Sequence, residues 1–363
     1  KKTVSAKTLW VKLIQNRVET GEPYIMYKDT VQNALPEYQK DMGLTVHHSN
    51  LCSEITLPTD KDRTAVCCLS SVNLEEYDEW CNDDQFIPDL IRMLDNVLTY
   101  FIDKAPPELY RAVFSAENER SIGLGAMGFH AYLQRQDIAF ESMWAASANH
   151  KMFSHIKAEA TRATKQLAEE RGECPDGKGH GVRNAHLLAV APNASSSIIC
   201  GNTSPSIEPY RANAFTQKTK SGSSLLKNEY LEHLLQEIGM DTDEVWKSIM
   251  TNGGSVQHLE FLDDHAKEVF KTGVEIDQRW VIQHAADRQQ YICQSQSLNV
   301  FFPANVSKQE LHAIHMMAWK KKVKTLYYLR SEAMKRAENV SDEALRKYIT
   351  DSIDENACLA CEG

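Results

Sequence analysis

The chain has 363 residues, of which 42% are hydrophobic and 25% are charged, so it can bury the core of one large α/β barrel or of two domains. Its net charge is -10 and its densest basic cluster is only Lys320–Lys322, which argues against polymeric nucleic acid as a partner. No apolar run approaches the length of a membrane span and the N-terminus lacks a signal-peptide pattern, so we expect a cytoplasmic protein with no membrane partner.

The cysteines and the first residue carry two further expectations. The nine cysteines follow no disulfide-framework spacing, so we expect them to be mostly reduced, with any redox pair being catalytic. The first residue is Lys1 instead of Met, from which we expect that the chain begins inside a longer natural protein.

Three regular elements are predicted in the first hundred residues. Residues 7–19 repeat apolar side chains near a 3.6-residue period, which predicts an amphipathic helix. Residues 24–26 predict a short strand, and the spacing of apolar residues in 86–100 predicts a second helix.

The segment Asn50-Leu-Cys52-Ser-Glu54 places an amide, a thiol and a carboxylate at alternate positions. In an extended backbone, alternate side chains share one face, so these three groups would converge on one small volume. Together they would supply a hydrogen-bond donor, a nucleophile or radical carrier, and a general base. The same letters also fit a half-buried strand with an ordinary thiol, and other motifs must decide between the two interpretations.

Two adjacent cysteines follow this motif. Residues 65–69 form an apolar run that predicts a buried strand end and contains Cys67 and Cys68. The charged stretch 60–63 predicts a turn, which could bring Cys67 back beside Cys52. A small buried hydrophobic residue explains Cys67 equally well.

The stretch 122–128 is rich in glycine. Its glycines match the letters G-x-G-x-x-G, but no strand clearly precedes them. Glu141 is the only candidate for the acidic residue that a dinucleotide site needs about 20 residues later. We therefore interpret these glycines as a site of close helix packing.

The middle of the chain combines a long helix, a strand and a hydroxyl-rich turn. Residues 145–171 predict a helix that ends near Gly172, and residues 186–191 predict a strand. The turn that follows consists of Pro192, Asn193, Ala194, Ser195, Ser196 and Ser197. Exposed backbone N–H groups in such a turn can bind phosphate, although an ordinary helix cap explains the same residues.

The last third is predicted to be mainly helical. Helices are expected at 224–238, 263–271 and 278–292, and Ser307-x-x-Glu310 is a capping box that would open another helix. Residues 323–328 predict a buried strand, and the alternation of strands and helices predicts an α/β fold with a parallel sheet or barrel.

Two short motifs lie near the C-terminus. Tyr327 and Tyr328 end the last predicted strand, where adjacent side chains would point to opposite faces and pack separately. Stacked phenols could instead pass an electron and a proton. Cys358-x-x-Cys361 lacks the further ligands of a zinc site, so a mobile dithiol that exchanges with another disulfide fits it better.

Taken together, these motifs resemble the large, catalytic subunit of class I aerobic ribonucleotide reductase. The resemblance covers essentially the whole chain and rests on seven motifs in order: Asn50-Leu-Cys-Ser-Glu54, Cys67-Cys-Leu-Ser70, Pro192-Asn-Ala-Ser-Ser-Ser197, Ile207-Glu-Pro209, Gln294-Ser-Gln-Ser-Leu-Asn299, Lys324-Thr-Leu-Tyr-Tyr-Leu329 and the terminal Cys358-x-x-Cys361.

The resemblance implies a fold. The chain would form the second half of a ten-stranded α/β barrel, with helices outside and a central finger loop. Residues 1–340 would belong to this half-barrel, and residues 341–363 would form a mobile, redox-active C-terminal tail.

The resemblance also implies residue roles in reducing ribonucleotides, as diphosphates, to deoxyribonucleotides. Cys52 would become a thiyl radical that abstracts the ribose 3′-hydrogen, Glu54 would take the 3′-hydroxyl proton, and Asn50 would hydrogen-bond the sugar. Cys67 would be one of two reducing thiols, since it lies three residues before the serine of the family pattern.

Further roles concern the substrate and the partners of the chain. Residues 192–197 would hold the substrate diphosphate, and Tyr327 and Tyr328 would relay the radical from a metal-bearing small subunit. Cys358 and Cys361 would reduce the spent disulfide and be reduced in turn by thioredoxin or glutaredoxin. No metal or other cofactor is expected in this chain itself.

The chain departs from the family at its front, because the family's large subunit is roughly twice as long. The effector site, the first half of the barrel and the partner thiol of Cys67 would lie in the missing part. We therefore expect a split large subunit, of a kind that would suit a bacteriophage, completed by a separate N-terminal polypeptide. A truncated full-length chain is the competing explanation.

Other functions remain open at this level. The anaerobic and cobalamin-dependent types of the same superfamily are disfavoured by the C-terminal sequence and by the paired tyrosines. A catalytically inert assembly or regulatory fragment would retain the barrel without the chemistry. A thiol–disulfide oxidoreductase would use Cys358 and Cys361 alone, without any nucleotide.

Overall fold

The computed structural model describes residues 3–219, 222–303 and 305–331. The predicted redox tail, with Cys358 and Cys361, lies outside the described residues. None of the helices in the described part is both long and apolar enough to cross a lipid bilayer.

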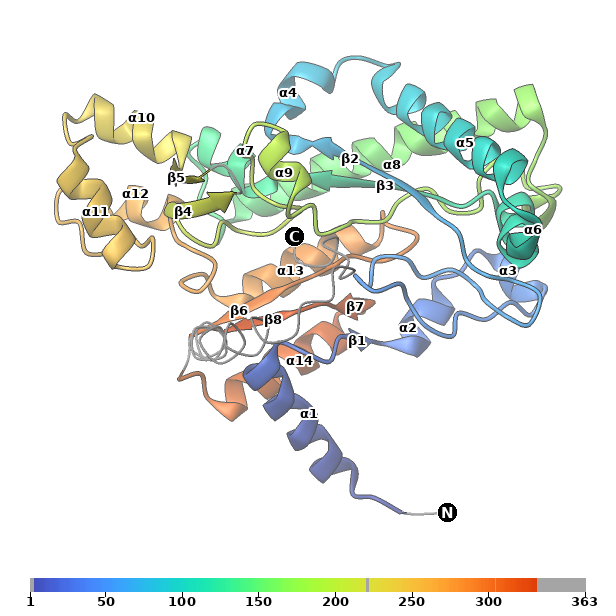
Figure 1. The fold of residues 1–363 in the computed structure, drawn as a ribbon, viewed down its shortest axis with the longest axis horizontal. Coiled ribbons are helices and arrows are strands. Elements are labelled where there is room, and N and C mark those ends of the chain that lie inside the picture. Colours follow the sequence, from blue (N-terminus) through green and yellow to red (C-terminus); the bar gives the residue numbers. More distant parts are fainter. Residues whose placement is uncertain (1–2, 220–221, 304, 332–363) are drawn as a thin grey trace.

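The centre of the molecule is a series of parallel strands (Figure 1). Strand β2 (Cys68–Asn73) pairs in parallel with β3 (Ile122–Met127). Next to β3 lies the extended segment 188–190, which forms parallel bridges through Leu124↔Leu188 and Val190↔Gln296. Strand β6 (Val300–Phe302) then pairs in parallel with β8 (Leu329–Ser331). The prediction of an α/β fold with parallel strands is therefore confirmed.

A short antiparallel strand borders this series. Strand β1 (Ile25–Met26) pairs with β7 (Thr325–Leu326), which directly precedes β8 in the chain. In the described part of the chain, β2 pairs only with β3, so its other edge is open. An open edge of this kind presents unpaired backbone groups to a further strand.

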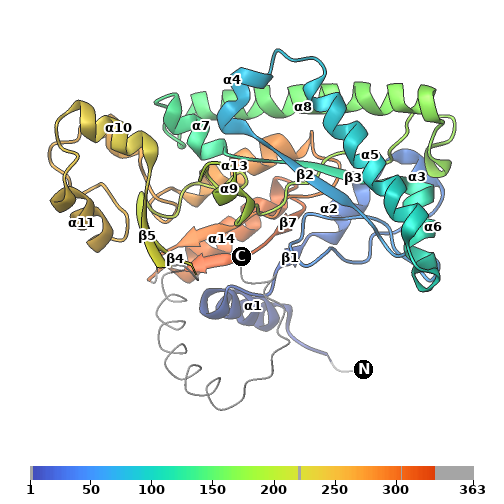
Figure 2. The same ribbon diagram turned by 45° about the horizontal axis from the view of Figure 1, so that its top comes forward.

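The helices lie mostly on the outside of the strands. Helix α8 runs along β2 and β3 from near α7 to the end of the molecule opposite α10 and α11, as Figure 2 shows, and it contacts α5 and α13. The helices are α1 (Ala6–Thr20), α2 (Lys28–Asn33), α3 (Glu37–Asp41), α4 (Tyr77–Trp80), α5 (Phe86–Lys104), α6 (Tyr110–Glu119), α7 (Phe129–Arg135), α8 (Met143–Arg171), α9 (Ser196–Ile199), α10 (Glu229–Glu237), α11 (Asp243–Thr251), α12 (Asp264–Val269), α13 (Gln278–Gln289) and α14 (Lys308–Lys320).

Most of the predicted helices are confirmed, and their ends follow from capping. Ser307 accepts a hydrogen bond from the backbone N–H of Glu310 at 3.1 Å, as the capping box predicted, and α14 begins there. The helix predicted at 224–238 is wrong in its first part. Residues 222–227 form β5 (Gly222–Lys227), which pairs with β4 (Ala214–Thr219), and α10 begins only after the cap Asn228.

The glycine-rich stretch is also different from the interpretation given above. It forms the fully buried strand β3 and is not a site of helix packing. A Cβ atom at Gly123 would lie 2.6 Å from the Leu69 side chain, and one at Gly125 would lie 2.5 Å from the Ala189 carbonyl oxygen. Glycine is therefore required because the neighbouring strands approach β3 closely on both sides.

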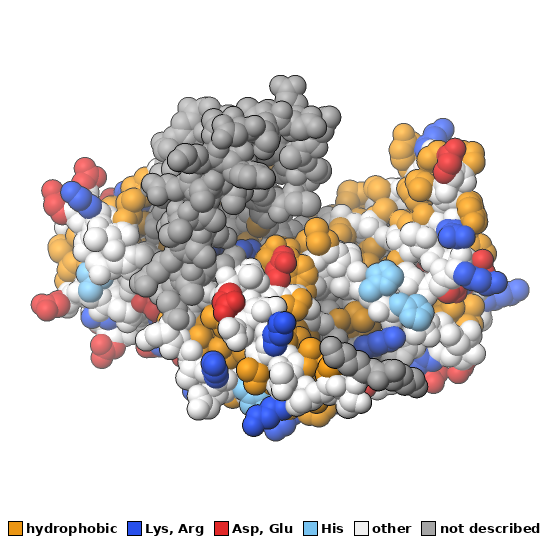
Figure 3. Space-filling model, turned by 60° about the horizontal axis from the view of Figure 1, so that its bottom comes forward, with side chains coloured by type: hydrophobic (Ala, Val, Ile, Leu, Met, Phe, Trp, Pro, Cys, Tyr) orange, Lys and Arg blue, Asp and Glu red, His pale blue; other side chains and the backbone are white. Residues whose placement is uncertain are grey.

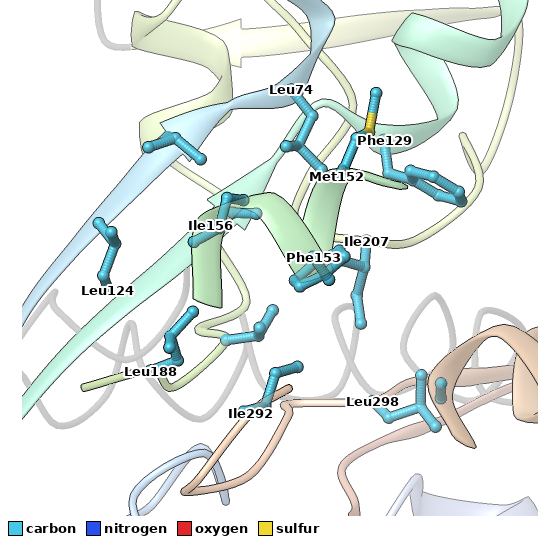
Figure 4. Packing of buried hydrophobic residues seen from close by; sticks show 14 of the residues in the cluster. Leu74, Leu124, Phe129, Met152, Phe153, Ile156, Leu188, Ile207, Ile292 and Leu298 are labelled. Atoms are coloured by element: carbon cyan, nitrogen blue, oxygen red, sulfur yellow. The ribbon is translucent and has the colours of Figure 1, made fainter. Parts of the chain in front are cut away.

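Two large hydrophobic clusters among the described residues, besides smaller ones, stabilise these elements. The larger one fills the space between the strands and the outer helices, and Figure 4 shows part of it around Leu124, Phe153 and Ile156. The smaller one lies in a lobe formed by the β4–β5 hairpin and helices α10, α11 and α12, where Trp246 is fully buried. The strands that carry the motifs therefore rest on the larger core.

Candidate active site

The segment that contains Cys52 is a tight turn and not an extended strand, so the predicted alternation of side chains is wrong. The backbone N–H of Asn50 donates to the Ile55 carbonyl at 3.2 Å, and the Ile55 N–H donates to Asn50 Oδ1 at 3.0 Å. Ser53 has a φ of 71°, a left-handed conformation that the turn requires. Asn50 thus closes the turn with its own side chain, and Cys52 lies near its tip.

The two arms of this loop pack against each other and against the sheet. Ile55 and Leu57 from the first arm form a small cluster with Ala65 and Cys67 from the second arm and with Ala189. The predicted turn between the arms is confirmed, because Asp60 Oδ1 accepts hydrogen bonds from the N–H groups of residues 62 and 63. The loop therefore brings Cys67 back alongside the segment that follows Cys52.

A buried ion-pair group anchors the second arm. Arg63 is 6% exposed and makes a bidentate contact with Asp176 at 2.7 and 2.8 Å. It also donates to Glu119 at 3.3 Å. Because these charges are buried, the loss of Arg63 would leave two carboxylates without their counterion. Arg63 therefore ties the loop to α6 and to the 175–177 turn.

The segment around Ser297, which leads into β6, forms hydrogen bonds with the tip of the loop. Ser297 Oγ lies within hydrogen-bonding reach of the Cys52 carbonyl and, at 3.0 Å, of Glu54 Oε2. The Ser295 N–H donates to the Glu54 carbonyl at 2.9 Å. Glu54, two residues after Cys52, is thereby buried, with 2% of its surface exposed.

Cys52 and Tyr327 come together although 275 residues separate them in the sequence. Tyr327 Oη donates to Cys52 Sγ at 3.5 Å, within the range expected for a hydrogen bond to sulfur. Burial raises the pKa of Tyr327, and the contact with Cys52 raises it further. The phenol therefore keeps its O–H at neutral pH, and this O–H points to the sulfur.

The two adjacent tyrosines do not occupy opposite faces, contrary to the default prediction. Their rings lie in contact, with centroids 4.4 Å apart at 59°. Residues 327 and 328 lie in the gap between β7 and β8, where the regular strand alternation is interrupted. Tyr328 is half-buried and extends the contact away from Cys52.

A third tyrosine, Tyr24, completes a ring cluster that sequence reasoning missed. Its ring centroid lies 4.5 Å from that of Tyr327 and 4.9 Å from that of Tyr328. Tyr24 directly precedes β1, and the pairing of β1 with β7 brings it there. The sequence predicted a strand at 24–26, but it did not indicate which strand would pair with it.

Cys67 lies just before β2, in contact with Gln294. Gln294 Nε2 donates to Cys67 Sγ at 3.4 Å and to the Ile122 carbonyl at 3.0 Å. Burial raises the pKa of the Cys67 thiol well above its usual range, and the hydrogen bond from Gln294 opposes this rise. Cys67 is therefore a protonated thiol at neutral pH.

The hydroxyl-rich turn follows the strand segment 188–190, as predicted. Asn193 has a φ of 53°, and its Nδ2 group donates to Ser71 Oγ and Ser196 Oγ, both at 3.1 Å. In the described part of the chain, the N–H groups of Ala194, Ser195 and Ser196 donate no backbone hydrogen bond. These N–H groups can therefore donate hydrogen bonds to a bound anion.

The buried carboxyl of Glu208 is linked through Asn299 to the backbone of Tyr328. Asn299 Nδ2 donates to Glu208 Oε1 at 2.7 Å, and Asn299 Oδ1 accepts the Tyr328 N–H at 2.9 Å. Burial raises the pKa of Glu208 from 4.5 to about 7. Both residues belong to motifs quoted above, but only the structure brings them into contact.

The arrangement as a whole brings together two half-buried thiols, a buried carboxylate and phenols from the Cys52 loop and from the segment that follows β7. Cys67 is a free thiol. Within the described ranges, no group of three or more His, Cys, Asp or Glu side chains is placed to hold a metal ion. A thiol in contact with a phenol can exchange a hydrogen atom with it, and a carboxylate can accept a proton.

Comparisons with known proteins all point to one protein family. The chain matches the family model described as ribonucleotide reductase, barrel domain, over residues 1–176 and 175–329. It is 50% identical over 366 residues to the ribonucleoside-diphosphate reductase large subunit of Invertebrate iridescent virus 3, covering 100% of this chain and 58% of that protein. It is also 50% identical over 364 residues to the putative large subunit of Frog virus 3, covering 99% and 63%.

A solved structure gives the same picture. The class Id ribonucleotide reductase alpha subunit of Actinobacillus ureae superposes with a TM-score of 0.85 at 44% identity, covering 90% of this chain and 61% of that one. The chain thus spans about three fifths of the length of these relatives.

Proposed function

The chain belongs to the ribonucleotide reductase large-subunit family, and on this premise we propose that it carries the thiyl-radical centre that reduces ribonucleotides to deoxyribonucleotides. The observation that carries the proposal is the contact of Tyr327 Oη with Cys52 Sγ at 3.5 Å. A phenoxyl radical at Tyr327 would take the hydrogen atom of the Cys52 thiol, so that an O–H bond forms as the S–H bond breaks. The thiyl radical at Cys52 would then take the 3′-hydrogen of the ribose.

Glu54 and Asn50 would act on the sugar. Glu54 would accept the proton of the 3′-hydroxyl, and Ser297 would orient its carboxylate through the hydrogen bond to Oε2. Asn50 uses its Oδ1 atom to close the turn, so its Nδ2 group is the part that would donate to the substrate. The positions of both side chains depend on the same turn as Cys52.

Cys67 would supply reducing electrons. As the 2′-hydroxyl leaves as water, Cys67 and a second thiol would give two electrons and join as a disulfide. We propose that the second thiol comes from the part of the relatives that this chain does not span. Cys358 and Cys361 would then reduce that disulfide, with thioredoxin or glutaredoxin as the external reductant.

The substrate would be a ribonucleoside diphosphate. The N–H groups of Ala194, Ser195 and Ser196 would hold its phosphates, and Asn193 would keep the turn in shape through Ser71. Such N–H groups bind anions through their partial positive charge. Pro192 and Ser197 would frame this turn at its two ends.

A metal-bearing small subunit would deliver the radical. Helix α14 lies directly before the tyrosine pair, and α1 and α14 enclose an apolar groove lined by Trp10, Ile14, Val18, Leu311 and His312. Figure 3 views the molecule with its lower face, where α1 and α14 lie, turned forward, and shows hydrophobic side chains among basic ones there. We propose that the small subunit docks at this groove.

The rest of the barrel would be needed as well. The open edge of β2 and the half-exposed Leu69 on it favour association with further strands, on the same or a separate polypeptide. A reducing cytoplasm would keep Cys67 in its thiol form.

Substitution of Cys52 tests the proposal. In a complex reconstituted with the small subunit and the remaining part of the barrel, Cys52→Ser should abolish deoxynucleotide formation while assembly remains normal. Cys81→Ser provides the matched control, because Cys81 follows α4 outside the site, and it should retain activity. Full activity of Cys52→Ser would remove Cys52 from the mechanism, and would favour an inert assembly fragment.

A further inference from the structure

The tyrosine cluster contains one more phenol than the proposed relay uses. Tyr24 contacts both Tyr327 and Tyr328, with centroid distances of 4.5 and 4.9 Å, while those two rings lie 4.4 Å apart. The three rings therefore form a closed triangle in which Tyr24 touches each member of the pair. Aromatic contacts at such distances favour defined ring orientations.

A buried arginine fixes the geometry of this triangle. Arg17 has no exposed surface, and its Nη2 group donates to the Tyr327 carbonyl at 3.0 Å. Its Nη1 group donates to the carbonyl of Pro23, the residue before Tyr24. Burial lowers the pKa of Arg17 to about 10, which still leaves it charged at neutral pH. One guanidinium thus joins the two backbone segments that carry Tyr24 and Tyr327.

The strand pairing provides a second, independent link. Ile25 and Leu326 are partners in the antiparallel pair β1–β7, so the residues on either side of them stay in register. Tyr24 precedes the first of these partners and Tyr327 follows the second. The contact between their rings is therefore a product of the fold and not of a mobile side chain.

The hydroxyl of Tyr24 donates a hydrogen bond to a solvent-exposed side chain. Tyr24 Oη donates to Glu22 Oε1 at 3.1 Å, and Glu22 is exposed whereas Tyr24 is half-buried. Burial raises the pKa of Tyr24, and the interaction with Tyr328 raises it further. The hydroxyl therefore lies between the polar surface and the two relay phenols, and it stays protonated.

We propose that Tyr24 is a positioning residue for the tyrosine relay, which holds the rings of Tyr327 and Tyr328 together and places its own hydroxyl beside theirs. The inference rests on the proposed function. In the relay, a hydrogen atom moves from the Tyr327 O–H to a Tyr328 phenoxyl, and then from the Cys52 S–H to the Tyr327 phenoxyl. Tyr24 gains and loses no atom in either step; it sets the distance and the hydrogen bonding of the phenols.

The first test does not require turnover. 3-Nitrotyrosine is placed at position 327, where its coloured phenolate reports ionisation during a pH titration. Burial and Cys52 raise the pKa of Tyr327, whereas Tyr24 lowers it. The one O–H of Tyr24 donates to Glu22 while Tyr327 is neutral, and it would turn to the phenolate when Tyr327 ionises. Tyr24→Phe should therefore raise the titration midpoint by about one pH unit, as expected for the loss of a hydrogen bond to a charged group.

Tyr27→Phe is the matched control for this titration. Tyr27 lies on the same segment, but its hydroxyl donates to the His315 carbonyl at 2.9 Å. It should leave the midpoint at position 327 unchanged. An unchanged midpoint in Tyr24→Phe, or an equal shift in both variants, would overturn the proposal.

The second test uses the reconstituted complex. Tyr24→Leu removes both ring contacts and should lower kcat by at least about tenfold with KM unchanged, while Tyr27→Phe retains its rate. Tyr24→Phe keeps the ring, so its kcat should lie between those of Tyr24→Leu and Tyr27→Phe. It also serves as a second variant if Tyr24→Leu does not fold. Normal kcat in Tyr24→Leu would refute the positioning role. If the unsubstituted complex does not turn over, the proposed function fails, and the titration still decides the role of Tyr24.

Discussion

The buried carboxyl of Glu208 gives a prediction about the pH dependence of stability. Glu208 is 4% exposed, and its pKa is raised from 4.5 to about 7 by burial. Between these two values the folded protein holds a proton that the unfolded chain releases. The contribution of Glu208 to the free energy of unfolding is therefore fully present below pH 4.5 and is lost as the pH rises through 7.

The magnitude follows from the size of the shift. At about 1.4 kcal/mol for each pKa unit, the change from 4.5 to about 7 corresponds to a loss of about 3 kcal/mol. Glu208→Gln removes this titration but keeps an oxygen to accept the hydrogen bond from Asn299 Nδ2. Relative to the unsubstituted protein, the variant should therefore gain up to about 3 kcal/mol of stability between pH 5 and pH 8.

Urea denaturation of the purified protein at several pH values measures this difference. Glu244→Gln, at an exposed position on α11, is the control and should follow the unsubstituted protein at every pH. If Glu208→Gln and the unsubstituted protein gave parallel curves from pH 5 to pH 8, the raised pKa of Glu208 would be refuted. The support that Glu208 gives to Tyr328 through Asn299 would then need another explanation.

Two more predictions concern the loop and its thiol. Arg63→Met should lower the free energy of unfolding by about 3–5 kcal/mol, measured by urea denaturation, because Asp176 loses its buried counterion. An effect below about 1 kcal/mol, as for a surface ion pair, would contradict this. Gln294→Leu should raise the pKa of Cys67 further and so slow its alkylation at a fixed pH, as measured by peptide mass spectrometry in a Cys68→Ser background. Equal or faster alkylation would show that Gln294 does not stabilise the Cys67 thiolate.

The tight turn at Cys52 changes how its neighbours can act. In an extended strand, Asn50 and Glu54 would have lain on one face with Cys52. In the turn, Asn50 closes the backbone, and Glu54 is buried against Ser297. Any substitution of Asn50 is therefore expected to move Cys52 as well as to remove a hydrogen-bond donor, which complicates a simple assignment of Asn50 to the substrate.

The structure also adds residues to the candidate site. Ser297 and Gln294 belong to one motif, in the segment 294–299 that leads into β6, and they contact the two halves of the loop, at Glu54 and at Cys67. The motif was visible in the sequence, but the sequence did not show which loop it faces. This segment thus contacts both the loop turn that carries the proposed radical thiol and the proposed reducing thiol itself.

The amino-acid sequence by itself determined the local features of this protein. Apolar periodicity located α1, α5, α8 and α13, and the Ser307 capping box located the start of α14. These signals act over a few residues, so they can be read without knowledge of the rest of the fold. The ordered motifs likewise identified the family before any contact was known.

Only the tertiary structure decided how the distant segments meet. It turned the Cys52 segment back on itself, made a buried strand of the 122–127 glycines, and placed Tyr24 against Tyr327. Each of these outcomes depends on a neighbour that is far away in the sequence, as with the 275 residues between Cys52 and Tyr327. Strand order and close packing decide which side chains become neighbours, and no local pattern contains that information.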